Sequence, residues 1–535
     1  MDYHCTYTSY KSTNFFSKIV VDYLSQATGL QPFYKHLPNK DGILNAIAER
    51  KIFITDRKLL VDYFNMQYAK AASIKQQKNI ELLASDNCFT ITTAHQPNIF
   101  TGPLYFIYKI LHAVKLAQEL NEELSDYNFV PVYYMGSEDA DLDELGNITI
   151  QEKKITWNTQ QTGAVGRMKV DKNFLQLIHE IESQIGVNEF GNELSSIFKQ
   201  CYTLDKTIQQ ATFELVNILF AEYGLLVLIP DNIDLKKAFI PTVTKELQEQ
   251  FSRKEVDKTN EEFGKHYKIQ AAGRELNLFY LINDRRERIE KVEQHFIVQN
   301  LEIQFSLDEI LIELNMHPER FSANVILRPV FQETILPNIV FIGGGGELAY
   351  WLQLKKVFEN AAVPYPVLVL RNSFLFYNTV QENKLQKMGY EIQNTFLSTE
   401  ELFVDLVKKQ SLHNLSLQEQ IEQANIFYQQ LEKQSAEIDI TLVAHTQAIA
   451  TKAIKKIEAL EKKLLRAEKR KFADQKNQLE IIKKDLFPNN NLQERVENMS
   501  HLYSIFGKKL IEIILTSSKG LTQKFGFICI NKKAS

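Results

Sequence analysis

Cysteine is scarce in this 535-residue chain, and its spacing excludes two kinds of small scaffold. The four cysteines lie far apart and form no CxxC pair: Cys5, Cys88, Cys201 and Cys529. This spacing argues against a zinc ribbon and against a disulfide framework. We expect reduced, mostly buried thiols, and the sequence assigns no metal ligand.

Long apolar runs and a strong excess of one charge are also missing. No stretch approaches the ~20 consecutive apolar residues of a membrane span. The N-terminus lacks the basic and then apolar segments of a signal peptide. Lys and Arg number 62 against 66 Asp and Glu, a net charge of −4, so no basic field favours nucleic acid. We expect a soluble, cytoplasmic protein that binds neither nucleic acid nor a membrane.

What is present is ordinary globular composition, 44% hydrophobic and 24% charged. At roughly 150 residues per domain, the length indicates three or four units. The first clear unit is strand, helix, strand: the β-branched run 88–95, an amphipathic helix over 104–120, and the apolar run 129–136. Such a βαβ unit is almost always right-handed. Ligands bind beyond the carboxyl ends of its strands.

The loop between the first strand and its helix carries the most informative side chains. These are His95, Gln96, Asn98, Thr101 and Gly102. The start of a helix offers backbone N–H groups and a positive dipole end to an anion. A histidine there can donate to phosphate or carboxylate, or move a proton near neutral pH. The alternative is a histidine that caps the helix or satisfies loop carbonyls.

Further segments are expected at the same edge of the sheet. Residues 137–146 follow the second strand and bring five carboxylates, among them Asp139 and Asp141, which could hold an amine, a hydroxyl or Mg²⁺. A third core strand over 224–232 ends in Asp231. The alternative for the acidic loop is a solvated, capping role, which is usual for charge runs.

The pattern of strands returns at 322–371. Arg328 is predicted at a strand end before Pro329, where its guanidinium could grip a carboxylate or phosphate, with Gln332 nearby. The run Gly343–Gly346 joins a strand to a helix and lets the backbone approach a ligand. Glu347 and Tyr350 follow it, whereas Trp351 is better explained as core. No GxxxxGK[ST] loop is present, so this is not a P-loop enzyme.

The segment 380–485 differs from the rest, being polar with few prolines or glycines. A 3-4-3-4-3 spacing of apolar residues predicts a coiled-coil seam: Ala450, Ala453, Ile457, Leu460, Leu464 and Ala467. Residues 452–484 hold 12 basic and 5 acidic residues but, apart from Phe472, no aromatic side chain on which a base could stack. A solvated face of a dimer explains these charges better than an RNA-binding arm.

Four blocks of this chain resemble the BshC-type family, the cysteine ligases of bacillithiol biosynthesis. They are FSKIVVDYLSQ near residue 16, TTAHQPNIFTGPLYFIYKI at 92–110, FVPVYYMGSEDADLDEL at 129–145, and the long block 322–358. Two departures are visible. Ala140 stands where many members have histidine, and the run Gly343–Gly346 lacks the proline that many members have.

The resemblance implies an α/β fold with a Rossmann-like core of the nucleotidyltransferase and class I synthetase type. It implies two connective-peptide insertions and an α-helical coiled-coil arm that forms a homodimer. The expected division is 1–150 (core), 151–222 (first insertion), 223–234 (core strand), 235–320 (second insertion), 321–380 (core), 381–505 (coiled coil) and 506–535, a C-terminal segment that packs back on the body.

The implied activity is the addition of cysteine to the amine of a glucosaminyl-malate acceptor through an activated cysteine carboxyl, with ATP and Mg²⁺ as expected cofactors. The expected catalytic residues are His95, Gln96, Asp139, Asp141 and Arg328. The expected substrate- or nucleotide-binding residues are Asn98, Thr101, Gly102, Asp231, Gln332, Gly343, Gly344, Gly345, Glu347 and Tyr350. The alternatives are a nucleotidyltransferase-like enzyme that uses the same core, or a non-catalytic coiled-coil scaffold.

Overall fold

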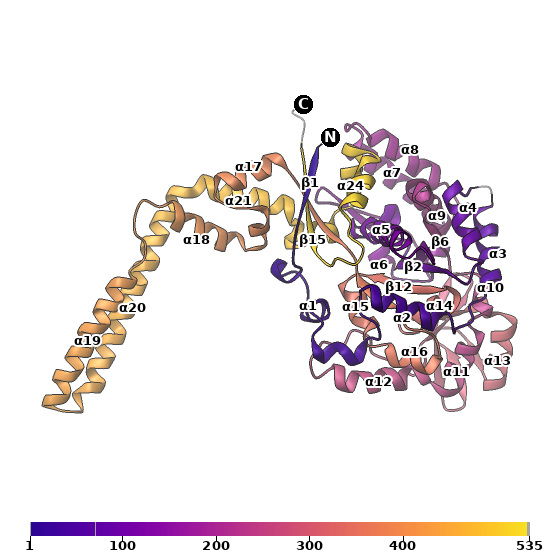
Figure 1. The fold of residues 1–535 in the computed structure, drawn as a ribbon, viewed down its shortest axis with the longest axis horizontal. Coiled ribbons are helices and arrows are strands. Elements are labelled where there is room, and N and C mark those ends of the chain that lie inside the picture. Colours follow the sequence, from indigo (N-terminus) through magenta and orange to yellow (C-terminus); the bar gives the residue numbers. More distant parts are fainter. Residues whose placement is uncertain (1, 70, 532–535) are drawn as a thin grey trace. The chain divides into compact units, whose positions relative to one another are not determined.

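A computed structural model describes residues 2–69 and 71–531 of the chain (Figure 1). The chain divides into two compact units. The larger unit comprises Cys5–Leu375 and Asn491–Ile528, and the smaller comprises Met1–His4, Phe376–Asn490 and Cys529–Ser535. Each unit is described separately.

The larger unit is built on a five-stranded parallel sheet of order β13-β12-β2-β3-β6. Its strands are β2 (Cys88–His95), β3 (Asn128–Met135), β6 (Leu226–Leu228), β12 (Asn338–Gly343) and β13 (Val367–Leu370). Every residue of β2 is buried, as the continuous apolar and β-branched run predicts for a central parallel strand. The register pairs His95 with Met135, so β2 and β3 end together. The α/β expectation and the strands predicted at 88–95 and 129–136 are confirmed, while the strand predicted over 224–232 is limited to Leu226–Leu228.

Helix α5 (Tyr105–Glu123) connects β2 to β3 and contacts both strands. Helix α2 (Lys40–Arg50) contacts β12 and β13. One core cluster joins these elements, with Ile47 of α2, Leu116 of α5 and Ile91 of β2 all fully or almost fully buried. At about 25 cal/mol per Å² of apolar surface, such side chains supply the main stabilisation of the layer.

The segments between the core strands form two distinct structures. The first holds the hairpin β4 (Asn147–Ile150) and β5 (Lys153–Thr156), and the helices α7 (Lys172–Ile185), α8 (Gly191–Cys201) and α9 (Ile208–Phe220). The second begins with α10 (Ile233–Lys237), α11 (Ile240–Glu249) and α12 (Phe251–Phe263). It continues into the five-stranded sheet β10-β9-β8-β7-β11, with β7 (Leu278–Ile282), β8 (Arg285–Val292), β9 (His295–Val298), β10 (Ile303–Phe305) and β11 (Phe321–Ala323), and with helix α13 (Leu307–Met316) before β11.

The predicted strand ending at Arg328 is wrong. After β11 the chain forms helix α14 (Leu327–Ile335), and Arg328 lies in its first turn. The side chain of Asn324 accepts hydrogen bonds from the backbone N–H groups of Ile326 and Leu327, which caps this helix. Pro329 fits here because the first turn of a helix needs no N–H donor at that position. The Asn324 cap and the early proline therefore favour a helix, although the segment 324–328 contains β-branched residues.

Two helical stretches of the chain are each divided. The stretch before β2 forms α3 (Arg57–Tyr68) and α4 (Ile74–Leu82). The pattern after Gly346 forms α15 (Gly345–Trp351) and α16 (Lys355–Ala361). Ser73 begins α4 with a reciprocal capping box to Gln76, a local stop-and-start signal that apolar periodicity does not reveal.

Two C-terminal helices return to the larger unit. They are α23 (Ser500–Phe506), which contacts α8, and α24 (Lys509–Ser517), which contacts α5. The final strand β15 (Phe525–Ile530) lies between β1 (Tyr3–Thr8) and β14 (Ser373–Asn378) in a three-stranded sheet. The boundary between the two units crosses all three of these strands.

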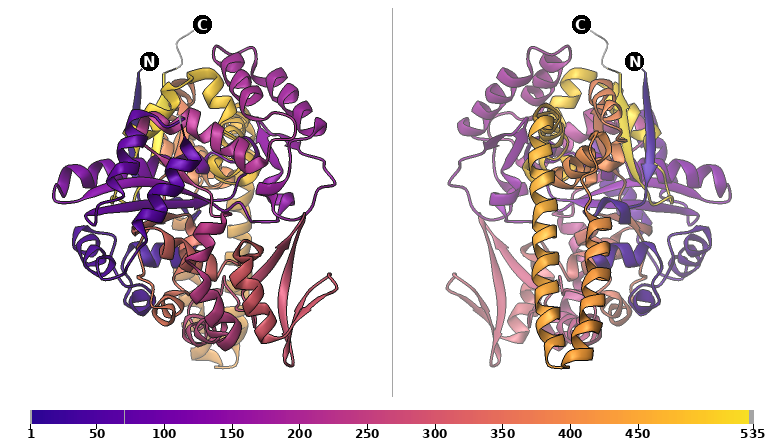
Figure 2. Two further views of the ribbon diagram at one scale, coloured as in Figure 1. Left: turned by 90° about the vertical axis from the view of Figure 1, so that its right-hand side faces the viewer. Right: turned by 90° about the vertical axis from the view of Figure 1, so that its left-hand side faces the viewer.

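The smaller unit is helical beyond that sheet. Its main elements are α17 (Thr379–Lys387), α18 (Thr399–Gln410), α19 (Gln418–Ile438), α20 (Leu442–Lys469) and α21 (Ala473–Leu486). Helices α19 and α20 lie side by side as a long hairpin (Figure 2). The predicted seam is only partly used within it, since Ala450 is buried but Leu460 and Leu464 are 50% and 37% exposed. Within the described residues, no helix is both long and apolar enough to cross a membrane.

Candidate active site

A cavity of about 760 Å³ opens beyond the carboxyl ends of the parallel strands, inside the larger unit. Its walls come from the ends of β2, β3 and β12, from the start of α14 and from residues 270–286, which lie between β6 and β12 in the sequence. Eight of the residues expected from the sequence line it: His95, Gln96, Asp139, Arg328, Gly344, Gly345, Glu347 and Tyr350. The structure therefore brings together residues separated by more than 200 positions in the chain.

His95 lies at the end of β2 with its ring against two aromatic side chains. The ring centroids are 5.3 Å from Tyr105 in an edge arrangement and 5.5 Å from Phe106. Burial, followed by the positive charges of Lys109 and Arg371, lowers the pKa of His95 well below its usual value. The imidazole is therefore neutral at neutral pH. Its Nε2 atom is buried and makes no hydrogen bond to any described residue.

The acidic loop after β3 is ordered by short-range hydrogen bonds. Gln96 Nε2 donates to Asp139 Oδ2 at 3.0 Å, which joins the first two expected catalytic segments. Asp141 is exposed and lies outside the cavity, and its Oδ1 accepts from the backbone N–H of Glu144 as the cap of a short helix. The capping alternative thus describes Asp141, whereas Asp139 and Glu144 face the cavity.

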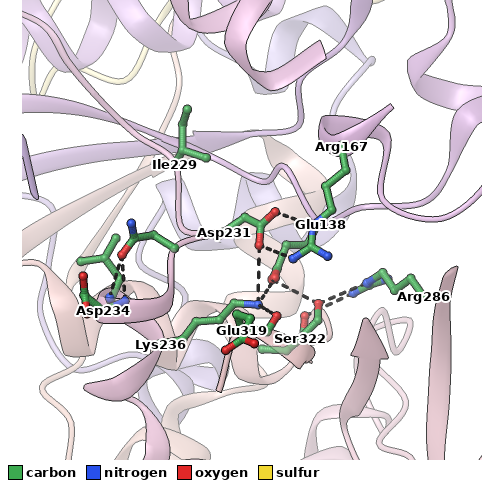
Figure 3. A network of polar contacts seen from close by, with 12 residues as sticks. Glu138, Arg167, Ile229, Asp231, Asp234, Lys236, Arg286, Glu319 and Ser322 are labelled. Atoms are coloured by element: carbon green, nitrogen blue, oxygen red, sulfur yellow. Dashed lines mark hydrogen bonds and ion pairs between the residues drawn. The ribbon is translucent and has the colours of Figure 1, made fainter. Parts of the chain in front are cut away.

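A network of ionic and polar contacts lies beside the cavity, which two of its members, Glu138 and Arg286, line (Figure 3). Lys236 of α10 pairs with Glu138, whose other oxygen accepts from Ser322 Oγ at 3.1 Å. The guanidinium of Arg167 donates two hydrogen bonds, of 2.7 and 2.6 Å, to the carboxylate of Asp231. Burial raises the pKa of Asp231, but the Arg167 hydrogen bond and the Lys236 charge outweigh it, and the pKa falls below the usual value. Asp231 therefore braces the wall rather than facing the cavity.

Arg286 extends this network into the cavity from strand β8. Its Nε donates to Ser322 Oγ at 3.2 Å, and its guanidinium lies 3.8 Å from the ring centroid of Phe279. Strand β8, which lies between β6 and β12 in the sequence, thus supplies a positively charged guanidinium to the cavity.

Arg328 is held by aromatic and amide groups. Its Nη2 donates to the Tyr350 hydroxyl at 2.7 Å, and its guanidinium lies 5.6 Å from the ring centroid of Tyr134. Gln332, one helical turn later, is fully buried and donates to Glu333 Oε1 at 2.9 Å. Gln332 does not line the cavity, but its Oε1 accepts a hydrogen bond from Arg328 Nη1 at 3.4 Å.

The glycine run after β12 is held in place by a hydrogen bond to the side chain of Glu347, the residue that follows it. Glu347 Oε2 accepts from the backbone N–H of Gly344 at 2.8 Å and pairs with Lys109, which also donates to the carbonyl of Ala94 at 2.9 Å. Gly343 is buried at the end of β12 and does not line the cavity. Trp351 is fully buried and stacks on Phe341 with centroids 4.1 Å apart, so it belongs to the core.

The loop after His95 differs from the expected anion site. Asn98, Thr101 and Gly102 are buried, and none of the three lines the cavity. The backbone N–H of Leu104 donates to the carbonyl of Glu497 at 2.8 Å, while Asn498 Nδ2 donates to the carbonyl of Gly102. The start of α5 is therefore capped by the C-terminal segment instead of by a ligand.

Several residues that line the cavity were not predicted from the sequence. They are the cations Lys109, Arg274, Arg286, Arg371 and Arg495 and the acids Glu138 and Glu144. Arg371 directly follows β13, so the strand-end rule could have found it. Arg371 pairs with buried Glu494 at 2.8 Å, whereas no partner for the guanidinium of Arg274 or Arg495 is seen within residues 2–69 and 71–531. No local sequence pattern predicts that Arg274 and Arg495 line the cavity.

Comparison with known proteins agrees with this architecture. Residues 1–372 match the family described as "Bacillithiol biosynthesis BshC, N-terminal Rossmann-like domain", and residues 374–530 match its "C-terminal coiled-coil domain". The chain belongs to the BshC family. The Rossmann-like core and the C-terminal helices are thus shared with the BshC family as a whole.

Relatives of the BshC family match over nearly the full length. A protein of Flavobacterium johnsoniae named "Putative cysteine ligase BshC" is 39% identical, covering 98% of this chain and 99% of its own. The equally named protein of Christiangramia forsetii is 38% identical, with the same coverage. A solved structure titled as a "putative arginyl t-RNA synthetase" from Campylobacter jejuni is 11% identical and covers 81% of this chain and 91% of its own. Its TM-score is 0.22, which is too low to bear on the fold.

Proposed function

We propose that this protein is a cysteine ligase that forms an amide bond between the carboxyl of cysteine and the amine of a glucosaminyl-malate acceptor, the last step of bacillithiol biosynthesis. Family membership and the names of the relatives support the ligase assignment. The main structural support for this reaction is the charge of the cavity. Six Lys and Arg side chains line it, compared with four Asp and Glu side chains.

A cationic cavity suits reactants that are anionic. Cysteine and the malate group carry carboxylates, and a nucleotide would add phosphates. An amide does not form in useful yield from a free carboxylate in water, so the carboxyl must first be activated. We assign that step to ATP, which would use the carboxyl edge of a nucleotidyltransferase-type core. Arg328, Arg371 and Lys109 line the cavity, and in this proposal they stabilise charge on the transferred group.

The acidic side of the cavity fits the amine. Asp139 and Glu144 line it, and burial together with the charges of Asp141 and Asp139 raises the pKa of Glu144 above its usual value. A carboxylate poised in this way can orient an ammonium group and accept its proton as the amine attacks. Neutral His95 acts as a hydrogen-bond donor or acceptor to the reacting carboxyl and does not contribute a positive charge.

The test combines the purified protein with cysteine, ATP and glucosaminyl-malate and follows the thiol product by mass spectrometry. We expect His95→Ala to abolish the product while the circular dichroism spectrum stays unchanged. His179→Ala is the matched control, because the His179 side chain is 72% exposed and lies outside the cavity. Near-normal product from His95→Ala would refute the site, and ATP–pyrophosphate exchange without cysteine would favour a nucleotidyltransferase.

A further inference from the structure

A second cluster of reactive side chains lies in the smaller unit, apart from the residues of the cavity. It joins His4 of β1, Cys529 of β15 and Glu382 of α17, with Tyr377 of β14 beside them. One ligand atom from each of His4, Glu382 and Cys529 lies within 4.8 Å of the others. The first and last strands of the chain therefore meet the first helix after β14 at one point.

Two contacts within the cluster, each to a different oxygen of the Glu382 carboxylate, have the length of a ligand–ligand edge in a metal centre. His4 Nε2 lies 3.3 Å from Glu382 Oε1, and Cys529 Sγ lies 3.6 Å from Glu382 Oε2. A tetrahedral Zn²⁺ site, with bonds of about 2.0 Å to N and O and about 2.3 Å to S, has N···O edges of about 3.3 Å and S···O edges of about 3.6 Å. The widest pair in the cluster would have to close by on the order of 1 Å.

The charges also fit a dication. Among the described residues, the printed ion pair of Glu382 is with His4. A thiolate at Cys529 and the carboxylate of Glu382 would together balance a charge of +2. A thiol, an imidazole and a carboxylate form a mixed set that suits Zn²⁺, whereas Mg²⁺ and Ca²⁺ prefer oxygen ligands alone.

We propose that His4, Glu382 and Cys529 form a zinc site that ties both ends of the chain to helix α17. The phenol oxygen of Tyr377 lies 3.5 Å from His4 Nε2 and 3.3 Å from Glu382 Oε1, next to the fourth coordination position. The His4 side chain is 49% exposed, which gives an ion access from solvent. This inference is independent of the proposed ligase reaction.

Binding has a defined proton balance. Formation of the Zn–S bond breaks the S–H bond and releases one proton to solvent. Binding therefore strengthens as pH rises through the neutral range.

Cobalt provides the test, because Co²⁺ occupies zinc sites and reports its ligands by colour. Tag-free, full-length protein is stripped with a chelator, kept reduced with a phosphine and titrated with Co²⁺. We expect one equivalent to bind, with a thiolate-to-cobalt charge-transfer band in the near ultraviolet that Zn²⁺ removes. Cys529→Ser should lose this band, and His4→Gln should weaken binding at least tenfold.

Two controls separate this site from other thiols and histidines. Cys5→Ser removes the cysteine adjacent to His4, and His445→Gln removes an exposed histidine of α20, and both variants should keep the band. Thermal unfolding of the metal-free proteins shows whether each variant is folded. Persistence of the band in folded Cys529→Ser, its loss in Cys5→Ser, or the absence of stoichiometric Co²⁺ binding to the wild-type protein would overturn the proposal.

Discussion

At the scale of single residues, burial sets the charge state of His95. Its ring is enclosed by Tyr105 and Phe106, and the positive charges of Lys109 and Arg371 lie nearby. All of these disfavour the imidazolium form, and they lower the pKa of His95 well below 6.5. A proton shuttle near neutral pH, as the sequence suggested, therefore fits the site less well than a neutral hydrogen-bonding group.

We predict that the His95 imidazole does not titrate between about pH 6 and 8, because its folded-state pKa lies below the unfolded value of about 6.5. The unfolded chain then binds more protons as pH falls, so this residue removes stability below about pH 6.5. NMR of protein with ¹³C-labelled histidine, with His95→Gln for assignment, measures the titration directly. A His95 midpoint at or above about pH 6.5 would contradict the prediction.

Some residues of the site could be predicted from a single rule, that ligands bind at the carboxyl ends of parallel strands. His95, Asp139 and Glu347 follow the ends of β2, β3 and β12, and the carboxyl edge of a parallel sheet gathers such positions. The rule does not reach Arg286 or Arg495. They come from an inserted sheet and from the C-terminal segment, and only the tertiary fold brings them to the cavity.

At the scale of elements, the buried strands were predictable because their apolar runs are continuous, while the starts of the helices were not. Asn324 begins α14 and Ser73 begins α4 by side-chain caps. Capping acts through one or two hydrogen bonds and leaves no trace in apolar periodicity. The turn after His95 is a further case, since its form is set by Asn498, almost 400 residues away.

Gly102 in this turn is predicted to be required for stability. Its φ of 62° and ψ of −147° are open essentially to glycine alone, and an added Cβ would lie 2.7 Å from Cβ of Asn98. Gly102→Ala should therefore lower the free energy of unfolding by about 1–3 kcal/mol, measured by denaturant titration. Gly346→Ala is the control, since a Cβ there meets nothing within 4 Å, and it should be neutral or slightly stabilising. Equal stability of the two variants would show that the turn is not strained.

At the scale of the whole molecule, the hairpin of α19 and α20 leaves an apolar stripe uncovered. Leu442, Ile449, Leu460 and Leu464 of α20 are 42%, 44%, 50% and 37% exposed. At 100° per residue they fall within about 60° of one helical face, beside the face that buries Ala450. Four large apolar side chains in one stripe are the pattern of a helix that packs against a partner.

We predict that this stripe joins two copies of the chain, in keeping with the coiled-coil seam expected from the sequence. Light scattering after size exclusion should give the wild-type protein twice the 62.0 kDa mass of one chain. Leu460→Glu combined with Leu464→Glu places carboxylates in the interface of a two-fold dimer and should give a folded monomer. Ile52→Glu is the matched control, because that side chain is 84% exposed in the larger unit and should leave the dimer intact. A monomeric wild-type protein, or a double variant that remains dimeric, would refute the interface.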